Sequence, residues 1–383
     1  MKKKIFFCLL IFISTFLIYK FIYPHPRNWY DHYKYLAQAF LAKRVDMPNL
    51  PQFYHDKVEI GGKVYLPFPP LPALVLAPII YLNSGITQQQ VSLLVGALNV
   101  ILVFLLLLKF TNLKNSLLLS YFFAFGTVFF WASVVGTAWY FAHLVAIMFF
   151  LLSLIAFKKK SFLLAGLFFS FAVLSRYPIF LGIIFYLLEL RKDKKGLIKF
   201  LSGALICIPI QFIYNYLRFG NFFQTGYLEV YKNYINMNYP FTLLQLIKPG
   251  FPYFGYLDPR NIPLHLFTFL FMPPVINLKN LVPSPYGMGI IFTTPLLLIA
   301  LKPPFKKIEK SLILGALGIA GVDFLHYMQG WVQFGYRFLL DFLPLLLIIL
   351  ALRFKPKKLL ILLLVFSILV NTWGVIWGIK LGW

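Results

Sequence analysis

The sequence predicts an all-α polytopic membrane protein that forms one integral domain over residues 1–383. Two observations carry this prediction. The chain is 60% hydrophobic and only 12% charged, whereas about a quarter of the residues in a typical soluble domain are charged. Its apolar residues form long runs, such as 93–108 and 117–135, and runs of this length suit a hydrocarbon core about 30 Å thick.

The net charge of +25 would suggest nucleic-acid binding in a soluble protein. Here the basic residues lie in short clusters between apolar runs, so they indicate membrane topology and contact with anionic lipid headgroups. We therefore expect membrane lipids, and no nucleic acid, among the partners. The two cysteines, Cys8 and Cys207, lie far apart in apolar runs and have neither a disulfide pattern nor metal-site spacing.

Basic residues concentrate in cytoplasmic loops, and this rule gives the expected topology. If all the basic clusters are cytoplasmic, an even number of spans separates neighbouring clusters, the N-terminus is cytoplasmic and the C-terminus is outside. The clusters lie at 2–4, 109–114, 158–160, 191–199, 302–310 and 353–358. About eleven transmembrane helices result, at 5–23, 88–108, 117–135, 139–157, 161–175, 177–190, 198–217, 285–301, 311–328, 337–352 and 359–378.

Two long outer-face loops follow from this topology, at 24–87 and 218–284. The proline-rich run 67–82 belongs to the first loop and is expected to form an interfacial helix, because a span there would invert every later loop. The stretch 161–190 is expected to form a hairpin of two short pieces with Arg176 near its apex. The first span resembles a signal peptide but lacks a small-residue cleavage site, so we expect it to be retained.

A second interfacial helix is expected from Tyr30 to Lys43, where the apolar residues keep helical spacing. Its polar face carries Asp31, which is thus held at the bilayer surface just after the first span. A carboxylate there is suited to act as a general base toward a hydroxyl group. The structural alternative is that Asn28 caps the helix, Asp31 interacts with the helix dipole and Lys34 pairs with it.

Four basic residues are candidates for holding an anion on the outer side. Arg176, Arg218 and Arg337 each lie near the outer end of an expected span, where burying an arginine is costly unless it has a partner or lines a cavity. Lys63 follows a Gly-Gly turn in the first outer loop, and its alternative is a simple headgroup contact. Arg337 also has an alternative, an intrahelical pair with Asp341 four residues later.

Several kinds of site are missing from the sequence. It contains neither a P-loop nor a dinucleotide-binding motif, and no soluble segment is large enough to bind a nucleotide sugar. Its six histidines lack the spacing of a helical zinc site. In the expected topology all six histidines and most of the eleven acids fall on or near the outer side, so the polar chemistry is expected there.

Taken in order, the motifs resemble the GT-C superfamily of glycosyltransferases that use a lipid-carried sugar. The resemblance is closest to the bacterial branch related to protein O-mannosyltransferases and aminoarabinose transferases. Each motif is short, and their order and common side of the membrane give the resemblance its specificity. The motifs are Asp31, Gly61 to Tyr65, Pro69 to Pro72, Ser175 to Pro178, Tyr214 to Tyr227, Ser284 to Gly289 and Gly330 to Arg337, which together reach across most of the chain.

The resemblance implies a multi-pass glycosyltransferase of the cell membrane with its active site on the outer face. It would move a sugar from a polyprenyl-phosphate donor to a glycan, lipid or protein acceptor. Many members carry two acids in the first-loop motif, whereas His32 follows Asp31 here, so the use of a divalent metal stays open and no other cofactor is expected.

The resemblance also implies roles for single residues. Asp31 would activate the acceptor, and basic side chains would hold the departing phosphate, which is electrostatic stabilisation of developing charge. The phosphate-binding residues would be Arg176, Arg218, Arg337 and, more weakly, Lys63, while His32, Asp56, Glu59 and Tyr65 are candidates for supporting the site. Asp56 and Glu59, acids of the same loop beside the Gly-Gly turn, are also the rivals of Asp31 for the role of base.

Three other functions stay open. A membrane transporter or lipid flippase would favour broken helices and charges near the membrane midplane, often with internal repeats, and no repeat is visible here. A lipid-linked oligosaccharide ligase would have its main outer loop late in the chain, as 218–284 is. A non-catalytic assembly subunit is the remaining alternative.

The expected topology is tested by cysteine labelling with a membrane-impermeant reagent, in a variant whose two native cysteines are replaced by Ala. Lys194→Cys is expected to stay unlabelled in intact cells, because it lies in a cytoplasmic cluster. Asn236→Cys is expected to react, because it lies in the second outer loop. Labelling at both positions, or at neither, would contradict this topology.

Overall fold

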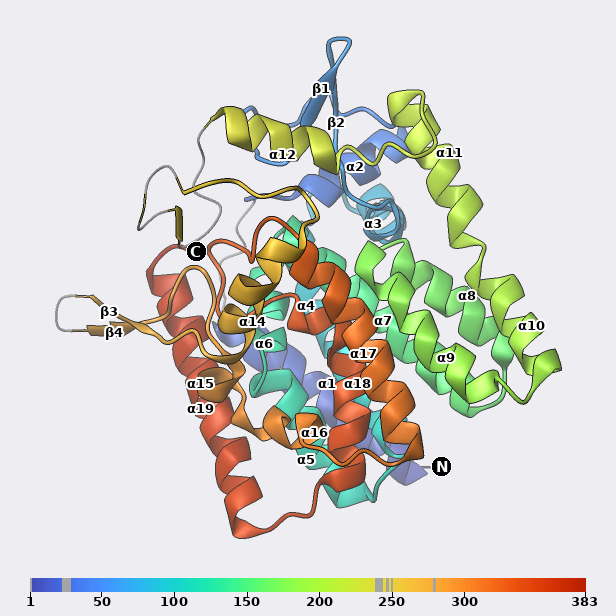
Figure 1. Ribbon diagram of the computed structural model, residues 1–383, viewed down its shortest axis with the longest axis vertical. Coiled ribbons are helices and arrows are strands. Elements are labelled where there is room, and N and C mark those ends of the chain that lie inside the picture. Colours follow the sequence, from blue (N-terminus) through green and yellow to red (C-terminus); the bar gives the residue numbers. More distant parts are fainter. Residues whose placement is uncertain (1, 23–28, 238–243, 246–247, 249–250, 278–279) are drawn as a thin grey trace.

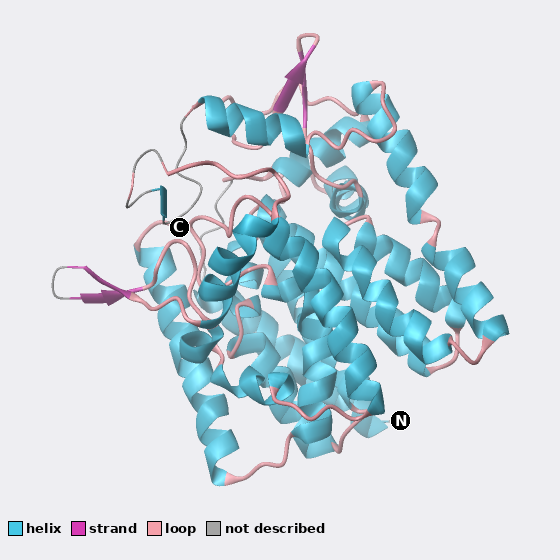
Figure 2. Ribbon diagram, viewed as in Figure 1, coloured by secondary structure: helices cyan, strands magenta, loops and turns pink. Residues whose placement is uncertain are grey.

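The structure is a computed structural model that describes residues 2–383 except 23–28, 238–243, 246–247, 249–250 and 278–279. Helices form an elongated bundle, and one end of it is covered by a layer of shorter helices, loops and two β-hairpins (Figures 1 and 2). The N-terminus lies at the opposite end of the bundle from this covering layer, whereas the C-terminus lies toward the layer. Termini at opposite ends of the bundle agree with a chain that crosses the membrane an odd number of times.

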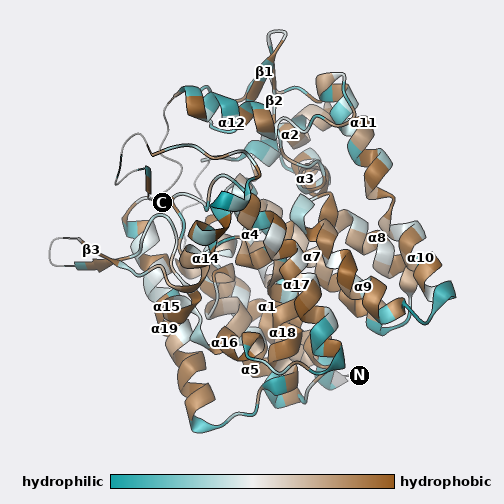
Figure 3. Cartoon of the chain, in the orientation of Figure 1, coloured by the Kyte–Doolittle hydropathy of each residue, from teal (hydrophilic) through white to brown (hydrophobic). Residues whose placement is uncertain are grey.

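The bundle is built by fourteen α-helices among the described residues, and most of them are strongly apolar (Figure 3). They are α1 (Lys2–Ile22), α4 (Gln88–Leu107), α5 (Leu113–Phe125), α6 (Phe129–Val135), α7 (Ala138–Lys158), α8 (Phe162–Val173), α9 (Ile183–Leu190), α10 (Lys194–Ala204), α11 (Cys207–Phe219), α15 (Ile290–Thr293), α16 (Leu298–Leu301), α17 (Lys307–Leu325), α18 (Leu339–Arg353) and α19 (Lys358–Lys380). Two 3₁₀ turns, η1 (Tyr177–Gly182) and η3 (Pro295–Leu297), connect some of them.

The covering layer comes from the two segments that the sequence predicts as outer loops. The first contributes α2 (His32–Leu41), the antiparallel pair β1 (Val58–Ile60) and β2 (Lys63–Tyr65), and α3 (Leu71–Leu82). The second contributes α12 (Tyr227–Asn236), η2 (Pro259–Asn261), α14 (Ile262–Leu270) and the antiparallel pair β3 (Val275–Asn277) and β4 (Asn280–Val282). The helices expected within 30–43 and 67–82 are therefore present, whereas the two hairpins were not expected.

Five helices of the described chain are long and apolar enough to cross a membrane by themselves, namely α1, α4, α7, the continuous stretch α10–α11 and α19. The bent pair α5 and α6, whose axes differ by 55°, makes a sixth if it counts as one span. The polytopic membrane fold is thus supported, and the count of about eleven spans stays a prediction. Shorter apolar helices include α8 and the η1–α9 stretch, which form the expected hairpin of two short pieces over 161–190.

One expected span is wrong as a continuous helix. Residues 285–301 form only the short pieces α15, η3 and α16. The interruption falls at Thr294, which has φ −147° and ψ 51°, directly before Pro295. A proline has no amide hydrogen and clashes with the preceding turn, so an α-helix ends before it.

The N-terminal end of α7 is fixed against α4 by side-chain hydrogen bonds. Gly136, just before α7, has φ +61°, where a glycine is favoured. Gln88 donates through Nε2 to the Gly136 carbonyl at 2.7 Å, and Gln89 donates to the Val134 carbonyl at 2.8 Å. These buried bonds set the position of the next residues of α7, which enter the site described below.

The turn between β1 and β2 is formed by Gly61 and Gly62, at φ +58° and +72°. Two successive positive φ angles are typical of the tight hairpin turn that glycine favours. A Cβ atom at either position would meet no other atom within 4 Å, so the tip of this hairpin projects freely from the covering layer (Figure 1).

Candidate functional site

Four helix ends meet beneath the covering layer and bring charged side chains together. Arg176 follows α8, His143 lies near the beginning of α7, Asp323 lies near the end of α17 and Asp341 lies in the first turn of α18. The two carboxylates and the imidazole are almost completely buried, and the Arg176 side chain is 17% exposed. The cluster therefore lies at the base of the layer, and Arg176 is its accessible member.

Asp341 is the centre of this cluster. Its Oδ2 accepts hydrogen bonds from Nε and Nη2 of Arg176 at 3.0 and 2.8 Å. Its Oδ1 is 2.7 Å from Nδ1 of His143. Asp323 is a weaker partner, with 3.5 Å between its Oδ1 and Nη2 of Arg176. Because an ionised carboxylate only accepts hydrogen bonds, we assign the proton on His143 to Nδ1.

The alternative pair Arg337–Asp341 is wrong, because α18 begins only at Leu339 and Asp341 is already bound to Arg176 and His143. Arg337 lies in the segment that leads into α18 and is only 8% exposed. Its guanidinium forms no ion pair and no hydrogen bond with any residue that the structure describes. Burial lowers the pKa of this guanidinium.

Phe338 brings the two arginines together. The guanidinium carbon of Arg176 lies 5.6 Å from the centre of the Phe338 ring, and that of Arg337 lies 5.2 Å from it. The two guanidinium groups thus contact one ring, next to the end of α17. An anion placed between them would be the natural partner of Arg337, since a buried unpaired cation is costly.

Asp56 of the first outer segment lies on the same side as these arginines. Its Oδ2 accepts a hydrogen bond from the Trp139 indole of α7 at 2.5 Å, and its Oδ1 accepts one from the Tyr234 hydroxyl of α12 at 2.8 Å. The next residue of α7, Tyr140, donates to the Val332 carbonyl at 3.1 Å, in the segment that leads to Arg337. The beginning of α7 therefore links Asp56 to the Arg337 segment.

Two electrostatic effects agree with this position. Burial, followed by the negative charge of Asp56, raises the pKa of Tyr327. The same carboxylate opposes the effect of burial on the pKa of Arg337. Asp56 itself has φ +56°, a backbone conformation that an aspartate tolerates better than most residues and that often marks functional positions.

Asp31 is in a different environment. Its Oδ2 accepts a hydrogen bond from the Gln88 amide at 3.3 Å, at the first turn of α4, and not from its own helix. Burial raises the pKa of this carboxyl to about 6, against the opposing effects of the Gln88 amide and Lys34. The structural alternative for Asp31 had two further parts. The proposed cap, Asn28, lies outside the described residues, and no ion pair joins Asp31 to Lys34 in the described part of the chain.

The predicted supporting residues His32, Glu59 and Tyr65 make contacts within the protein that stabilise the first outer segment. His32 is buried, with its ring nitrogens 3.1 and 2.9 Å from the carbonyls of Tyr30 and His55. Glu59 is exposed on β1 and pairs with Lys57 at 3.0 Å. Tyr65 is buried at the end of β2 against the ring of Phe219.

Arg218 and Lys63 are separate from the two clustered arginines. Arg218 ends α11 and is already bound, through the Leu66 carbonyl and through Asn215 Oδ1 at 2.8 Å, and its guanidinium lies 3.8 Å above the Tyr214 ring. It joins the first outer segment to α11. Lys63 is exposed on β2 beside the hairpin tip. The structure thus brings Arg176 and Arg337 together at Phe338 and holds Asp56 against the beginning of α7, whereas Lys63 lies apart on the hairpin.

Sequence reasoning missed Trp139, Tyr234, Tyr327 and His143. Aromatic residues at the ends of apolar runs are also typical of membrane interfaces, so nothing distinguished these from an aromatic belt. His143 lies inside an apolar run with no polar neighbour in sequence, and its partner Asp341 is 198 positions away. Among the described residues no group of three or more His, Cys, Asp or Glu side chains could hold a metal ion.

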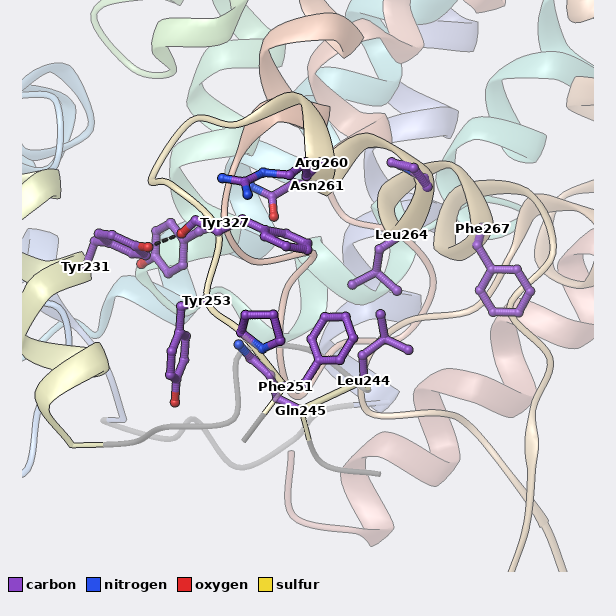
Figure 4. Close-up of a pocket in the computed structure, with 13 residues that line it drawn as sticks. Tyr231, Leu244, Gln245, Phe251, Tyr253, Arg260, Asn261, Leu264, Phe267 and Tyr327 are labelled. Atoms are coloured by element: carbon purple, nitrogen blue, oxygen red, sulfur yellow. Dashed lines mark hydrogen bonds between the residues drawn. The ribbon is translucent and has the colours of Figure 1, made fainter. Parts of the chain in front are cut away.

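A cavity of about 390 Å³ is lined in part by Tyr327 (Figure 4). Its walls are mainly apolar and aromatic and come from the second outer segment. The lining includes Tyr231, Phe251, Tyr253, Leu264, Phe267 and Tyr327, with Arg260 at the edge. Arg260 is paired with Asp258 at 2.7 Å, so its charge is already neutralised by the chain.

No protein-family model and no curated protein matches the sequence. Solved structures do show similarity. The oligosaccharyltransferase of Archaeoglobus fulgidus in its apo form is 13% identical with a TM-score of 0.50, and matches 97% of this chain and 56% of its own. The same organism's oligosaccharyltransferase AglB, in complex with an inhibitory peptide and a dolichol-phosphate, is 12% identical with a TM-score of 0.50, and matches 98% and 56%.

A third similar structure is ArnT from Cupriavidus metallidurans bound to undecaprenyl phosphate, 11% identical with a TM-score of 0.49, matching 93% of this chain and 61% of its own. At these identities the similarity concerns the fold alone. The GT-C-like fold predicted from the sequence is confirmed. The chain spans little more than half the length of the proteins it resembles.

The unpaired state of Arg337 predicts an unusual effect on stability. Arg337→Met is expected to raise the free energy of unfolding by about 1 kcal/mol or more, because it removes a desolvated charge that has no described partner. The thermal unfolding temperature in neutral detergent and phosphate-free buffer should therefore rise. Fluorescence-detected unfolding measures this.

The matched control is Arg353→Met. Arg353 is also largely buried but is bound to Glu309, with 2.9 Å between Nη2 and Oε2. Its loss leaves a buried carboxylate unpaired and should destabilise by about 3–5 kcal/mol. If Arg337→Met destabilises as much as Arg353→Met does, Arg337 has a structural partner and is not reserved for a ligand.

Proposed function

We propose that this protein is a glycosyltransferase that moves a sugar from a polyprenyl-phosphate carrier to an acceptor on the outer face of the membrane. The observation that carries the proposal is Arg337, a buried guanidinium without a described protein partner, next to Arg176 on the Phe338 ring. Guanidinium groups bind phosphate oxygens in a planar fork, which lysine cannot copy.

The fold supports a lipid-linked donor. One similar structure holds dolichol-phosphate and another holds undecaprenyl phosphate. In this chain the two arginines lie where the ends of α8 and α17 and the beginnings of α7 and α18 meet the covering layer. An amphiphile whose tail lies in the bilayer could present its phosphate there.

In the proposed reaction the acceptor hydroxyl attacks the anomeric carbon of the sugar. The bond between that carbon and the phosphate oxygen breaks, and the phosphate leaves with the electron pair. Arg176 and Arg337 stabilise the charge that develops on the phosphate. The proton of the hydroxyl passes to a carboxylate within hydrogen-bond reach.

We assign this base to Asp56, with Asp31 as the alternative that the sequence predicts. Both oxygens of Asp56 are oriented by donors, from Trp139 and Tyr234, and the carboxylate acts electrostatically on Arg337. The charge that acts on the Asp31 carboxyl is that of Lys34, and its hydrogen bond is to the α4 backbone. The contacts of Asp56 with Trp139 and Tyr234, together with its effect on Arg337, therefore support Asp56 over Asp31 as the base.

The proposal names no particular sugar, and its acceptor is a glycan, a lipid or a protein. A transporter or flippase is the main alternative function. It would move the lipid without breaking the bond between sugar and phosphate, so the two functions differ in their products.

The donor assay uses the purified protein in nanodiscs with a mixture of extracted cell-envelope glycans, lipids and proteins as acceptors. A radiolabelled undecaprenyl-phosphate sugar is expected to lose its label to an acceptor, and the corresponding nucleotide sugar is expected to give none, because the phosphate site lies at the end of a membrane bundle. Transfer from the nucleotide sugar without any lipid carrier would refute the proposal.

The base is tested with the pair Asp56→Asn and Asp31→Asn in the same assay. Asp56→Asn is expected to lower turnover by about 10²–10⁴-fold with donor binding retained, since a general base supplies an effect of this size. Asp31→Asn is expected to keep turnover within about tenfold of the unmodified protein. It would lose only an interaction at a helix end, which contributes about 1 kcal/mol to stability. The reverse result would assign the base to Asp31.

A further inference from the structure

We propose that Asp341 and His143 are positioning residues that hold Arg176 in the one orientation in which it can bind the carrier phosphate. This inference rests on the proposed function, because it concerns the phosphate site of that reaction. Neither Asp341 nor His143 would touch the substrate. They act through the guanidinium of Arg176.

The hydrogen bonds show how one edge of Arg176 is used. Nε and Nη2 both donate to Oδ2 of Asp341, at 3.0 and 2.8 Å, and Nε also lies 3.3 Å from Oδ1. Nη1 has no hydrogen bond with any described residue. Because the guanidinium is planar, fixing the Nε–Nη2 edge also fixes the direction of Nη1.

Exposure differs between the two partners. Asp341 is completely buried, whereas the Arg176 side chain is 17% exposed. Arg176 is therefore the member of the pair that a ligand can reach. An arginine side chain has several rotatable bonds and loses rotamer freedom when it is immobilised. Asp341 removes that freedom before the phosphate arrives, so the phosphate does not have to order the side chain itself.

His143 fixes the carboxylate in turn. Its Nδ1 donates to Oδ1 of Asp341 at 2.7 Å, from the beginning of α7, while Arg176 occupies Oδ2 from the end of α8. The carboxylate therefore cannot rotate without losing a bond on one side. The arrangement connects α7, α8 and α18 at the end of the bundle where Arg337 also lies.

Asp323 provides an internal comparison. It is a second buried carboxylate near the same guanidinium, 2% exposed, but it approaches Nη2 only at 3.5 Å and no hydrogen bond joins them. Its Oδ2 has no hydrogen-bond partner in the described chain. Asp323 therefore lies beside the Arg176 guanidinium without constraining its orientation. A positioning role and a mere charge requirement thus predict different results for the two aspartates.

The experiment measures binding of farnesyl phosphate and of farnesol to the purified full-length protein in nanodiscs of neutral lipid. The ratio of the two dissociation constants reports on phosphate recognition alone, and a general loss of structure would not change it selectively. Asp341→Asn is expected to reduce the preference for the phosphate about tenfold, and Asp323→Asn to reduce it less than threefold. Each variant is first checked for a cooperative unfolding transition.

His143 supplies a second route if Asp341→Asn does not fold. His143→Leu removes the donor to Oδ1 and is expected to reduce the phosphate preference, whereas His143→Asn, which can place an amide hydrogen near the position of Nδ1, is expected to restore most of it. The double variant Arg176→Lys with Asp341→Asn is expected to be no weaker than Arg176→Lys alone, because Asp341 acts only through the guanidinium.

The possible failures are distinguishable. If the unmodified protein does not prefer farnesyl phosphate to farnesol, the proposed function itself fails. If it does, and Arg176→Lys lowers that preference while Asp341→Asn and His143→Leu do not, only the positioning role fails. Equal losses for Asp341→Asn and Asp323→Asn, or additive losses in the double variant, would also overturn it and leave a requirement for charge alone.

Discussion

Pairing of buried charge is the constraint on which this structure depends. The antiparallel helices α17 and α18 are joined by an arginine and a carboxylate at each end. At one end Glu309 of α17 binds Arg353 of α18, with 2.9 Å between Nη2 and Oε2. At the other end Asp323 and Asp341 flank Arg176, which comes from the end of α8. Each charge would be costly in an apolar bundle if it were alone, so the pairs fix how these helices align.

Against that background Arg337 is the exception. It lies within reach of the same Phe338 ring as Arg176, yet no described carboxylate neutralises it. Arg176 and Arg353 bind carboxylates and Arg218 binds carbonyl and amide oxygens, whereas the Arg337 guanidinium forms no hydrogen bond with any described residue. That contrast is the observation from which an anion-binding role for Arg337 is proposed.

The fold was predictable from the sequence as far as local signals reach. Apolar runs gave the helical bundle, the spacing of Tyr33, Leu36 and Phe40 gave α2, and proline content placed α3 outside the bundle. The break at Thr294–Pro295 was missed because a single proline interrupts an otherwise apolar run. Short hairpins such as β1–β2 were missed because strands of three residues show almost no periodicity. These misses come from signals that are shorter than the window needed to detect them.

The site was predictable only in part, for a related reason. The cost of burying an arginine in an apolar bundle pointed to Arg176 and Arg337, and these two residues do lie together. Their partners could not be found, because Arg176 meets Asp341 across 165 positions and Asp56 meets Tyr234 across 178. The spacing between Arg337 and Asp341 fitted a helical pair, but the helix starts between them. Choosing between Asp31 and Asp56 required tertiary contacts that no local pattern contains.

The free tip of the β1–β2 hairpin has a practical consequence. A 44.4 kDa membrane protein whose mass lies mostly inside a detergent micelle or nanodisc offers few features for aligning single-particle images. Gly61 and Gly62 face open space and form a turn at the far end of a short, rigid ladder. A small folded epitope or a rigid fusion inserted between them would protrude from the covering layer as a fiducial mark, without touching the helices that hold Arg176 and Arg337.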